Sequence, residues 1–227
     1  MKLLAVETAT EACSAALSID GVITERYVIA ANTHTRLILP MIDELMHEAG
    51  LQPDDLDGLA FGCGPGSFTG VRIATGVVHG IGFGLDLFIA PVSTLAAIAQ
   101  DYFDHHDENV AFVAMDARMS EIYWAVYQRD AEGFAQALQD EVVAPAEAIE
   151  FPDISGVGLG TGWGNYQQPL MTKLADRVIR IEADLRPRAR AIARLGEQQF
   201  ANGLAVPVEQ ALPVYLRDKV AKKESER

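Results

Sequence analysis

The sequence has 227 residues, of which 49% are hydrophobic and 22% are charged, and its formal net charge is −14. These proportions are typical of a soluble globular protein that buries a substantial core. The charge is uneven, because residues 1–172 carry 6 lysines and arginines against 24 aspartates and glutamates, whereas residues 173–227 carry 12 against 8. Nucleic-acid affinity comes largely from basic side chains that neutralise phosphates, so the acidic body argues against RNA or DNA binding by the chain alone.

The N-terminus and the cysteines favour a cytoplasmic protein. Glu7 interrupts the first apolar run, which does not fit a signal peptide. Cys13 and Cys63 lie in separate apolar runs and do not resemble a disulfide framework. The long apolar region at residues 73–99 is broken by a histidine, an aspartate and a proline, so we interpret it as helix, strand and helix in a soluble core rather than a membrane span.

The first hundred residues predict three strands followed by alternating helices and strands. In chain order, the expected elements are strands at 3–9, 12–19 and 21–30, a helix at 35–49, a strand at 58–64, a helix from 67, a strand at 87–92 and a helix from 93. Asp20-Gly21 between the second and third strands is a strong hairpin signal. This order predicts a ribonuclease H-like half.

The same pattern then begins again, which indicates a duplication. Residues 113–117 and 121–128 repeat the first two strands, and Glu7 and Asp116 take the same place at the end of the first strand. A third strand is expected at 134–144, followed by a strand at 156–163, a helix at 165–176, a strand at 177–183 and a helix at 188–202. The sequence therefore predicts an α/β fold of two βββαβα halves, at residues 1–103 and 104–227.

Two charged segments are interpreted as solvated surfaces. Residues 101–108 hold four acidic residues and two adjacent histidines, but adjacent histidines in a polar turn have no fixed metal-binding geometry, so a connector is expected. Arg186, Arg190 and Arg194 share one helix face at four-residue spacing. We interpret this face as solvated, although it is the one plausible contact for a nucleic acid.

The glycine-rich stretch FGCGPGSFTGVRIATG, residues 61–76, is the most distinctive motif. It lacks the lysine of a phosphate-binding loop and does not complete a dinucleotide-binding G-x-G-x-x-G pattern. What remains is a strand, a tight turn and a helix with Ser67 as its cap, whose free N–H groups could hold an anion. Gly64, Gly66 and Ser67 are therefore a candidate anion-binding turn, with a purely structural turn as the alternative.

The helix after this turn predicts a surface for another helix. Three glycines recur every four residues, and each interior glycine costs about 1 kcal/mol relative to alanine, so the stripe needs an offsetting gain such as close helix packing. The helix at 35–49 carries more apolar residues than one core-facing stripe requires. The predicted partner interface comprises Leu37, Ile38, Met41, Leu45, Ile73, Gly76, Val77, Gly80 and Gly84. Burial of both helices by the second half is the alternative.

Several segments together resemble one family. LAVETATEACSAALS, NTHTRLILPMID, GCGPGSFTGVRIATG, PVSTLAA and ALPVYLRDK are similar to the TsaB family, also called YeaZ, over nearly the whole chain. The resemblance implies the fold shared by actin, Hsp70 and the sugar kinases (ASKHA), and the role of a non-catalytic subunit in bacterial tRNA threonylcarbamoyladenosine (t6A) synthesis. The implied partners are a TsaD-type catalytic paralogue and a TsaE-type ATPase, which act on adenosine 37 of tRNAs reading ANN codons.

The resemblance also implies that this chain is not the catalytic subunit. In the TsaD paralogue an H-x-x-x-H pair on a helix binds the metal, and the matching positions here are Thr94 and Ile98, which cannot replace imidazole ligands. We therefore expect no catalytic residue, no metal site and no tightly bound cofactor in this chain. ATP, the metal and tRNA would be met only in the complex, and the isolated chain would form a homodimer.

Other candidate chemistry has weak support in the sequence. Cys63 has no histidine nearby, and Ser67 and His79 would lie about 18 Å apart along one helix. Glu7 and Asp116 could flank a magnesium ion between the halves, as acidic residues do in this fold class. The alternative functions are a degenerate sugar-kinase-like phosphotransferase and a peptidase homologue of the M22 type.

Overall fold

The computed structural model describes residues 1–30 and 32–217, so residues 218–227 of the predicted second half lie outside the described part. The first half contains β1 (Lys2–Glu7), β2 (Ala12–Ile19), β3 (Val22–Ile29), α1 (His34–Glu48), η1 (Pro53–Asp55), β4 (Gly58–Gly64), α2 (Phe68–Leu85), β5 (Ile89–Ser93) and α3 (Thr94–Phe103). The second half contains β6 (Val110–Arg118), β7 (Glu121–Arg129), β8 (Ala135–Ala137), β9 (Val142–Ala144), η2 (Ala146–Ala148), β10 (Gly156–Leu159), α4 (Thr161–Leu174), η3 (Ala175–Arg177), β11 (Val178–Glu182), α5 (Ala189–Ala201) and η4 (Val208–Gln210).

The two sheets have the same topology, which confirms the predicted α/β class of duplicated ribonuclease H-like halves. The first sheet has the order β3-β2-β1-β4-β5, and the second has β8-β7-β6-β10-β11. In each sheet the second strand of the half pairs antiparallel with the first, and the later strands pair parallel to it. The carboxyl ends of the parallel strands therefore face the same edge of each sheet, where ligand sites of α/β folds usually lie.

The third strand of the second half differs from the prediction of one strand at 134–144. It forms two short strands, β8 and β9, which pair with different parts of β7. Between them Glu141 turns inward and accepts hydrogen bonds from the hydroxyls of Ser93 and Tyr127. A half-buried carboxylate in this position is stabilised by those donors, and the strand is interrupted where Glu141 reaches them.

Helix α4 begins four residues earlier than predicted and is kinked. Tyr166 has non-helical backbone angles, and Pro169 lies inside the helix. A proline inside a helix removes one backbone hydrogen bond and crowds the preceding turn, which accounts for the kink.

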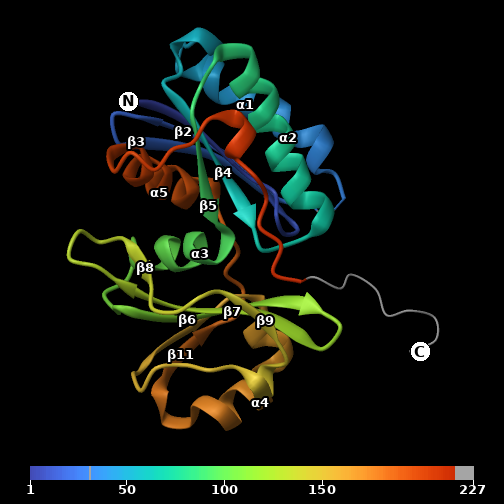
Figure 1. The fold of residues 1–227 in the computed structure, drawn as a ribbon, viewed down its shortest axis with the longest axis vertical. Helices are drawn as coiled ribbons and strands as arrows, with labels where there is room; N and C mark the ends of the chain where they lie inside the picture. Colours follow the sequence, from blue (N-terminus) through green and yellow to red (C-terminus); the bar gives the residue numbers. More distant parts are fainter. Residues whose placement is uncertain (31, 218–227) are drawn as a thin grey trace, which may run out of the picture.

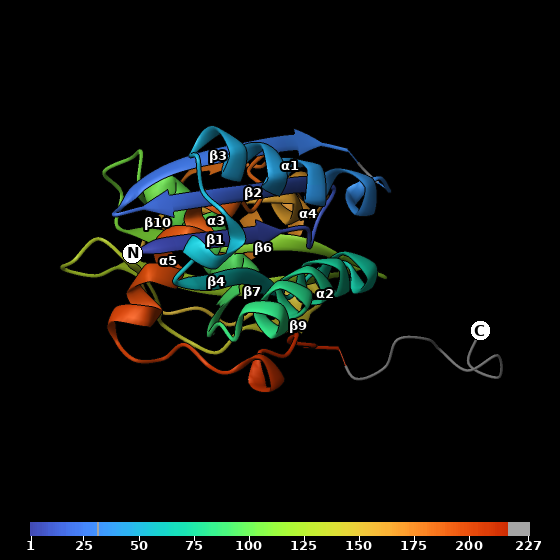
Figure 2. The ribbon, with the colours of Figure 1, turned by 90° about the horizontal axis from the view of Figure 1, so that it is seen from above.

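The helices form three layers around the two sheets (Figures 1 and 2). Helices α1 and α2 cover the outer face of the first sheet, and α4 covers the outer face of the second. Helices α3 and α5 pack against each other in the middle layer, α3 mainly on the second sheet and α5 on the first. Four apolar clusters, one for each sheet face, hold this arrangement.

Helix α5 follows the second half in sequence but lies on the first sheet. A Cβ atom on Gly196 would lie 2.7 Å from the Cβ of Ala60, so only glycine allows this approach. After α5 the chain stays with the first half, where Val206 forms a bridge with Ile89. The two repeats therefore exchange helices in space, and the boundary between residues 103 and 104 stays a prediction.

We predict opposite stability effects for one chemical change at two helical glycines. Gly196→Ala should lower the free energy of unfolding by about 1–3 kcal/mol, because the added methyl group overpacks the contact with the first sheet. Gly84→Ala should leave stability unchanged or raise it by up to about 1 kcal/mol, because open space surrounds this position and alanine is the better helix former. Urea unfolding of both variants checks this, and equal effects would contradict the packing of α5.

Candidate partner interface and cleft

The glycine stripe of α2 faces away from this chain's own core. The helix begins after Ser67, whose hydroxyl accepts the Gly70 N–H at 3.3 Å, and it buries a stripe against β4. Cβ atoms built on Gly76, Gly80 and Gly84 would meet nothing within 4 Å. The alternative in which the second half buries this stripe therefore does not hold for the glycines.

The other predicted interface residues divide into two groups. Ile38 and Leu45 are each 1% exposed and lie in the core between α1 and the first sheet, so their assignment to a surface needs correction. The apolar residues of α1 surround most of the helix, and the sequence did not show which stripe faces the sheet. Four further residues lie half-buried at the outer edge of the same cluster: Leu37, Met41, Ile73 and Val77.

Two exposed apolar side chains of α1 and α2 were missed. Leu39 of α1 is 57% exposed, and Phe83 of α2 is 63% exposed. Phe83 lies three residues after Gly80 and seven after Gly76, a spacing that places it on the same helix face. Helical periodicity counted from the glycines could therefore have identified it. Helices α1 and α2 contact each other over the first sheet, so they present one continuous surface, which we call the α1–α2 face (Figure 2).

Helix α2 is also the one helix among the described residues that is long and apolar enough to cross a membrane by length and composition. Its buried residues pack on the first sheet, so part of its apolar character belongs to the core of this fold.

The glycines of the Gly64–Gly70 turn permit close contacts within the chain. A Cβ on Gly66 would lie 2.6 Å from the carbonyl oxygen of Ala9, and one on Gly64 would lie 2.8 Å from that of Val214. The Ser67 N–H donates to the Ala9 carbonyl at 2.7 Å. Contact with the β1–β2 turn accounts for Gly66 and Ser67, and contact with the C-terminal segment accounts for Gly64, while anion binding at the turn stays a prediction.

A cleft of about 850 Å³ lies between the two halves. Residues at the N-terminal ends of α1, α2 and α4 line it, together with the β1–β2 and β6–β7 turns. Within it, Asp116 accepts hydrogen bonds from Asn165 at 3.0 Å and from the Arg118 N–H at 2.8 Å. Glu11 and Arg186 form an ion pair at the wall. The cleft is polar, and these charged groups already pair with one another.

Glu7 does not reach this cleft, which corrects the hypothesis of a magnesium ion between Glu7 and Asp116. Its carboxylate is fully buried and accepts hydrogen bonds from the Ala9 N–H and, at 3.4 Å, from the Thr94 hydroxyl. Gly62 leaves the space, because a Cβ there would lie 1.9 Å from Glu7 Oε2. Burial raises the pKa of Glu7 from 4.5 to about 7.

The remaining candidate chemical groups have structural contacts. Ile98 packs in the core between α3 and the second sheet, and burial raises the pKa of the Cys63 thiol to about 12, so this thiol stays protonated. The His79 ring lies 2.8 Å from the Ala211 carbonyl oxygen. Across residues 1–30 and 32–217, no three His, Cys, Asp or Glu side chains come together as a metal site.

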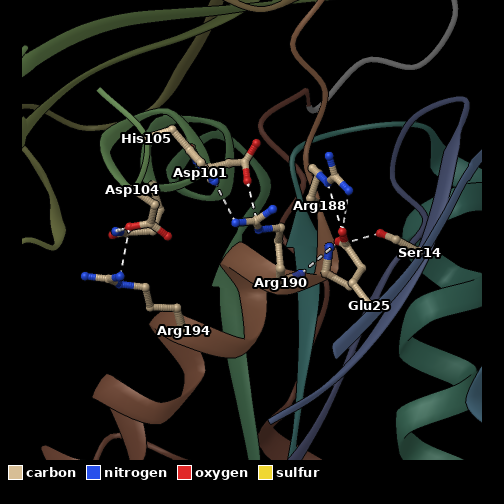
Figure 3. Close-up of polar contacts among 10 residues, drawn as sticks. Ser14, Glu25, Asp101, Asp104, His105, Arg188, Arg190 and Arg194 are labelled. Carbon is tan, nitrogen blue, oxygen red and sulfur yellow. Dashed lines mark hydrogen bonds and ion pairs between the residues drawn. The ribbon is translucent and has the colours of Figure 1, made fainter. Parts of the chain in front are cut away.

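The interpretation of Arg186, Arg190 and Arg194 as one solvated helix face is wrong. Arg186 lies before α5 and pairs with Glu11. Arg190 and Arg194 pair with Asp101 and Asp104 in the segment interpreted as a connector, and Arg188 pairs with Glu25 of β3 (Figure 3). The partners lie 89 residues or more away in the sequence, so periodicity alone could not find them.

The duplicated halves, the exchanged middle helices and the cleft between them define the ASKHA class of fold. Residues 18–225 match the family model described as "TsaD: tRNA N6-adenosine threonylcarbamoyltransferase". The TsaB protein of Escherichia coli is 40% identical over 97% of this chain and 96% of its own, and that of Haemophilus influenzae is 37% identical over 97% and 95%. The structure of YeaZ from Pseudomonas aeruginosa matches with a TM-score of 0.88 and 40% identity, over 95% of this chain and 99% of that one.

This chain therefore belongs to the TsaB (YeaZ) family of tRNA threonylcarbamoyladenosine biosynthesis proteins.

The raised pKa of Glu7 predicts a pH dependence of stability. Because the folded state holds this proton more tightly than the unfolded state, the contribution is full below pH 4.5 and is lost as the pH rises through about 7. At about 1.36 kcal/mol per pKa unit, the free energy of unfolding should fall by roughly 3 kcal/mol over this range. Glu7→Gln keeps a neutral side chain that can accept the Ala9 N–H, so it should remove this fall. Urea unfolding at about pH 5 and about pH 8 measures it, and equal pH slopes in both proteins would contradict a protonated Glu7.

Proposed function

We propose that this chain is a non-catalytic subunit of tRNA threonylcarbamoyladenosine synthesis and that it pairs with a TsaD-type catalytic subunit through the α1–α2 face. The observation that carries the proposal is the open glycine stripe of α2, with the exposed Phe83 on the same helix face and the exposed Leu39 on α1. Small residues let a second helix approach closely, and the apolar side chains beside them give the contact its free energy.

The kind of partner follows from the relationship between the two families. The match to the TsaD family model means that a TsaD-type protein shares this chain's fold over much of its length. Two proteins of one fold can pair their equivalent surfaces about an approximate two-fold axis, as in an isologous dimer. The same face then accounts for a homodimer of the isolated chain, which exchanges for the heterodimer when the partner is present.

A non-catalytic role is supported by what occupies the positions that match the TsaD metal ligands. Thr94 donates a hydrogen bond to Glu7, and Ile98 lies in the core. These positions serve packing in this chain. We propose that ATP and the metal belong to the catalytic partner and to the TsaE-type ATPase, and that this chain alone holds no cofactor tightly.

The contact with tRNA is proposed to occur only through the complex. The acidic body repels phosphates, and the arginines of α5 are paired with carboxylates of this chain. We place the chain in the cytoplasm, where tRNA modification takes place. Its contribution is to hold the catalytic subunit in a competent arrangement for transfer to adenosine 37 of tRNAs reading ANN codons.

Gly80→Leu is the sharpest test of the α1–α2 face. Leucine at the centre of the stripe should block close helix approach and weaken binding of the TsaD-type partner by at least about 100-fold, with loss of tRNA modification in a reconstituted assay. The fold should remain intact, because the position is open and leucine is the better helix former. Calorimetric titration measures the binding, and circular dichroism checks the fold.

Gln167→Leu is the matched control, since it adds the same side chain at an exposed position of α4 in the second half. It should bind the partner like the wild type. Normal binding by Gly80→Leu, or equal loss in both variants, would contradict the assignment of the partner interface.

The isolated chain should dimerise through the same face, because exposed apolar side chains on a flat helix surface favour association. Sedimentation velocity at high micromolar concentration should show a dimer for the wild type and a monomer for Phe83→Ser. A wild-type protein that remains monomeric under these conditions would exclude the homodimer.

A further inference from the structure

The basic residues near the C-terminus pair with acidic residues of the preceding body. The pairs that join segments far apart in the sequence are Arg186–Glu11, Arg188–Glu25, Arg190–Asp101, Arg194–Asp104 and Arg217–Glu121. All five arginines lie after residue 185, and all five carboxylates lie before residue 122. The uneven charge of the sequence is therefore matched inside the molecule.

The first set of pairs connects the two helices of the middle layer (Figure 3). Arg190 Nε lies 3.4 Å from Asp101 Oδ1, and Arg194 Nη1 lies 3.1 Å from Asp104 Oδ1. Arg190 also lies 2.7 Å from His105 Nε2. The two aspartate side chains are only 12% and 14% exposed. Because α5 packs on the first sheet and α3 mainly on the second, these pairs bridge the two halves.

The placement of these charges is unfavourable for each helix alone. Asp101 and Asp104 lie at the C-terminal end of α3, where the helix dipole favours positive charge. Arg190 lies in the first turn of α5, where the dipole favours negative charge. Contact between the two helix ends brings each of these charges beside an opposite charge on the other helix.

The second connection lies at the C-terminal segment, residues 211–217, which we call the strap (Figure 1). The strap is attached to the first half, where the Val214 N–H donates to the Cys63 carbonyl at 2.7 Å and the Tyr215 ring lies 6.2 Å from that of Phe68. Its last described residue, Arg217, reaches the β6–β7 hairpin of the second half. There it donates to the Ala117 carbonyl at 2.9 Å and pairs with Glu121.

We propose that the arginines of α5 and Arg217 of the strap form two electrostatic clamps that hold the halves at one relative orientation. One clamp acts in the middle layer and the other at the β6–β7 hairpin, so the halves cannot rotate apart without breaking one of them. The clamps turn a two-half fold with a cleft into a rigid body. This inference concerns the chain by itself and does not depend on the proposed partner.

The orientation of the halves can be measured as a distance between two spin labels. Asp54→Cys in η1 and Asp176→Cys in η3 place one label on each half at exposed positions. Cys13 and Cys63 are buried with raised pKa values, so the new cysteines react selectively. The labelled chain is diluted with excess unlabelled chain, so that only distances within one molecule contribute. The parent protein should give a single narrow distance distribution.

Two clamp variants should broaden the distance distribution and shift it to longer distances. One is the double variant Arg190→Gln with Arg194→Gln, and the other is the single variant Arg217→Gln. Arg26→Gln is the control, because it removes one positive charge and two ion pairs that lie within the first half. It should leave the distribution narrow. Broadening in either clamp variant, without broadening in the control, supports the clamp at that side.

An unchanged distribution in both clamp variants would overturn the proposal and would show that apolar packing alone fixes the halves. Equal broadening in Arg26→Gln would also overturn it, because the effect would then follow from general loss of charge pairing. Circular dichroism confirms folding first, and Arg194→Gln alone replaces the double variant if that protein does not fold. If a variant with a broadened distribution binds the partner normally, the proposal still holds for the free chain. Partner binding then does not depend on the clamps.

Discussion

The close packing of α5 on the first sheet is the constraint on which the rest of the structure depends. The contact at Gly196 and Ala60 brings a helix from the end of the sequence into the core of the first half, and α3 lies beside it against the second sheet. Apolar burial drives this middle layer, since each sheet must cover its inner face. Once the inner faces are covered, α1 and α2 can only occupy the outer face of the first sheet. Their surface is then free for another molecule.

The cleft between the halves and the α1–α2 face differ in how far their groups are already in contact with the rest of the chain. At the cleft, Asp116 is bonded within its own half and the glycine turn packs on its neighbours, whereas Glu7 lies buried outside the cleft and is bonded to Thr94. These groups satisfy one another, which is what buried polar groups require for stability. On α2, by contrast, open space surrounds Gly76, Gly80 and Gly84. Of these two regions, the α1–α2 face therefore has more surface left uncovered by this chain.

The sequence predicted those parts of the structure that depend on local patterns. Alternating apolar residues located the strands and the duplication, and the four-residue spacing of glycines located the open face of α2. It did not predict contacts between distant segments. Ile38 and Leu45 were misplaced because α1 is apolar on most sides, and only the position of the sheet decides which side is buried. The pairs of Arg190 and Arg194 were missed because their partners lie on another helix, and the strand break at Glu141 depends on a hydroxyl of β5 and one of β7.

Hydrogen–deuterium exchange of the chain with and without its TsaD-type partner tests the central claim most directly, because each backbone amide reports its own burial. The account predicts slower exchange on binding in residues 35–48 and 68–85, with no change in α4 or in the exposed part of α5. Protection of the cleft turns at residues 8–11 and 117–121, with α2 unchanged, would contradict it.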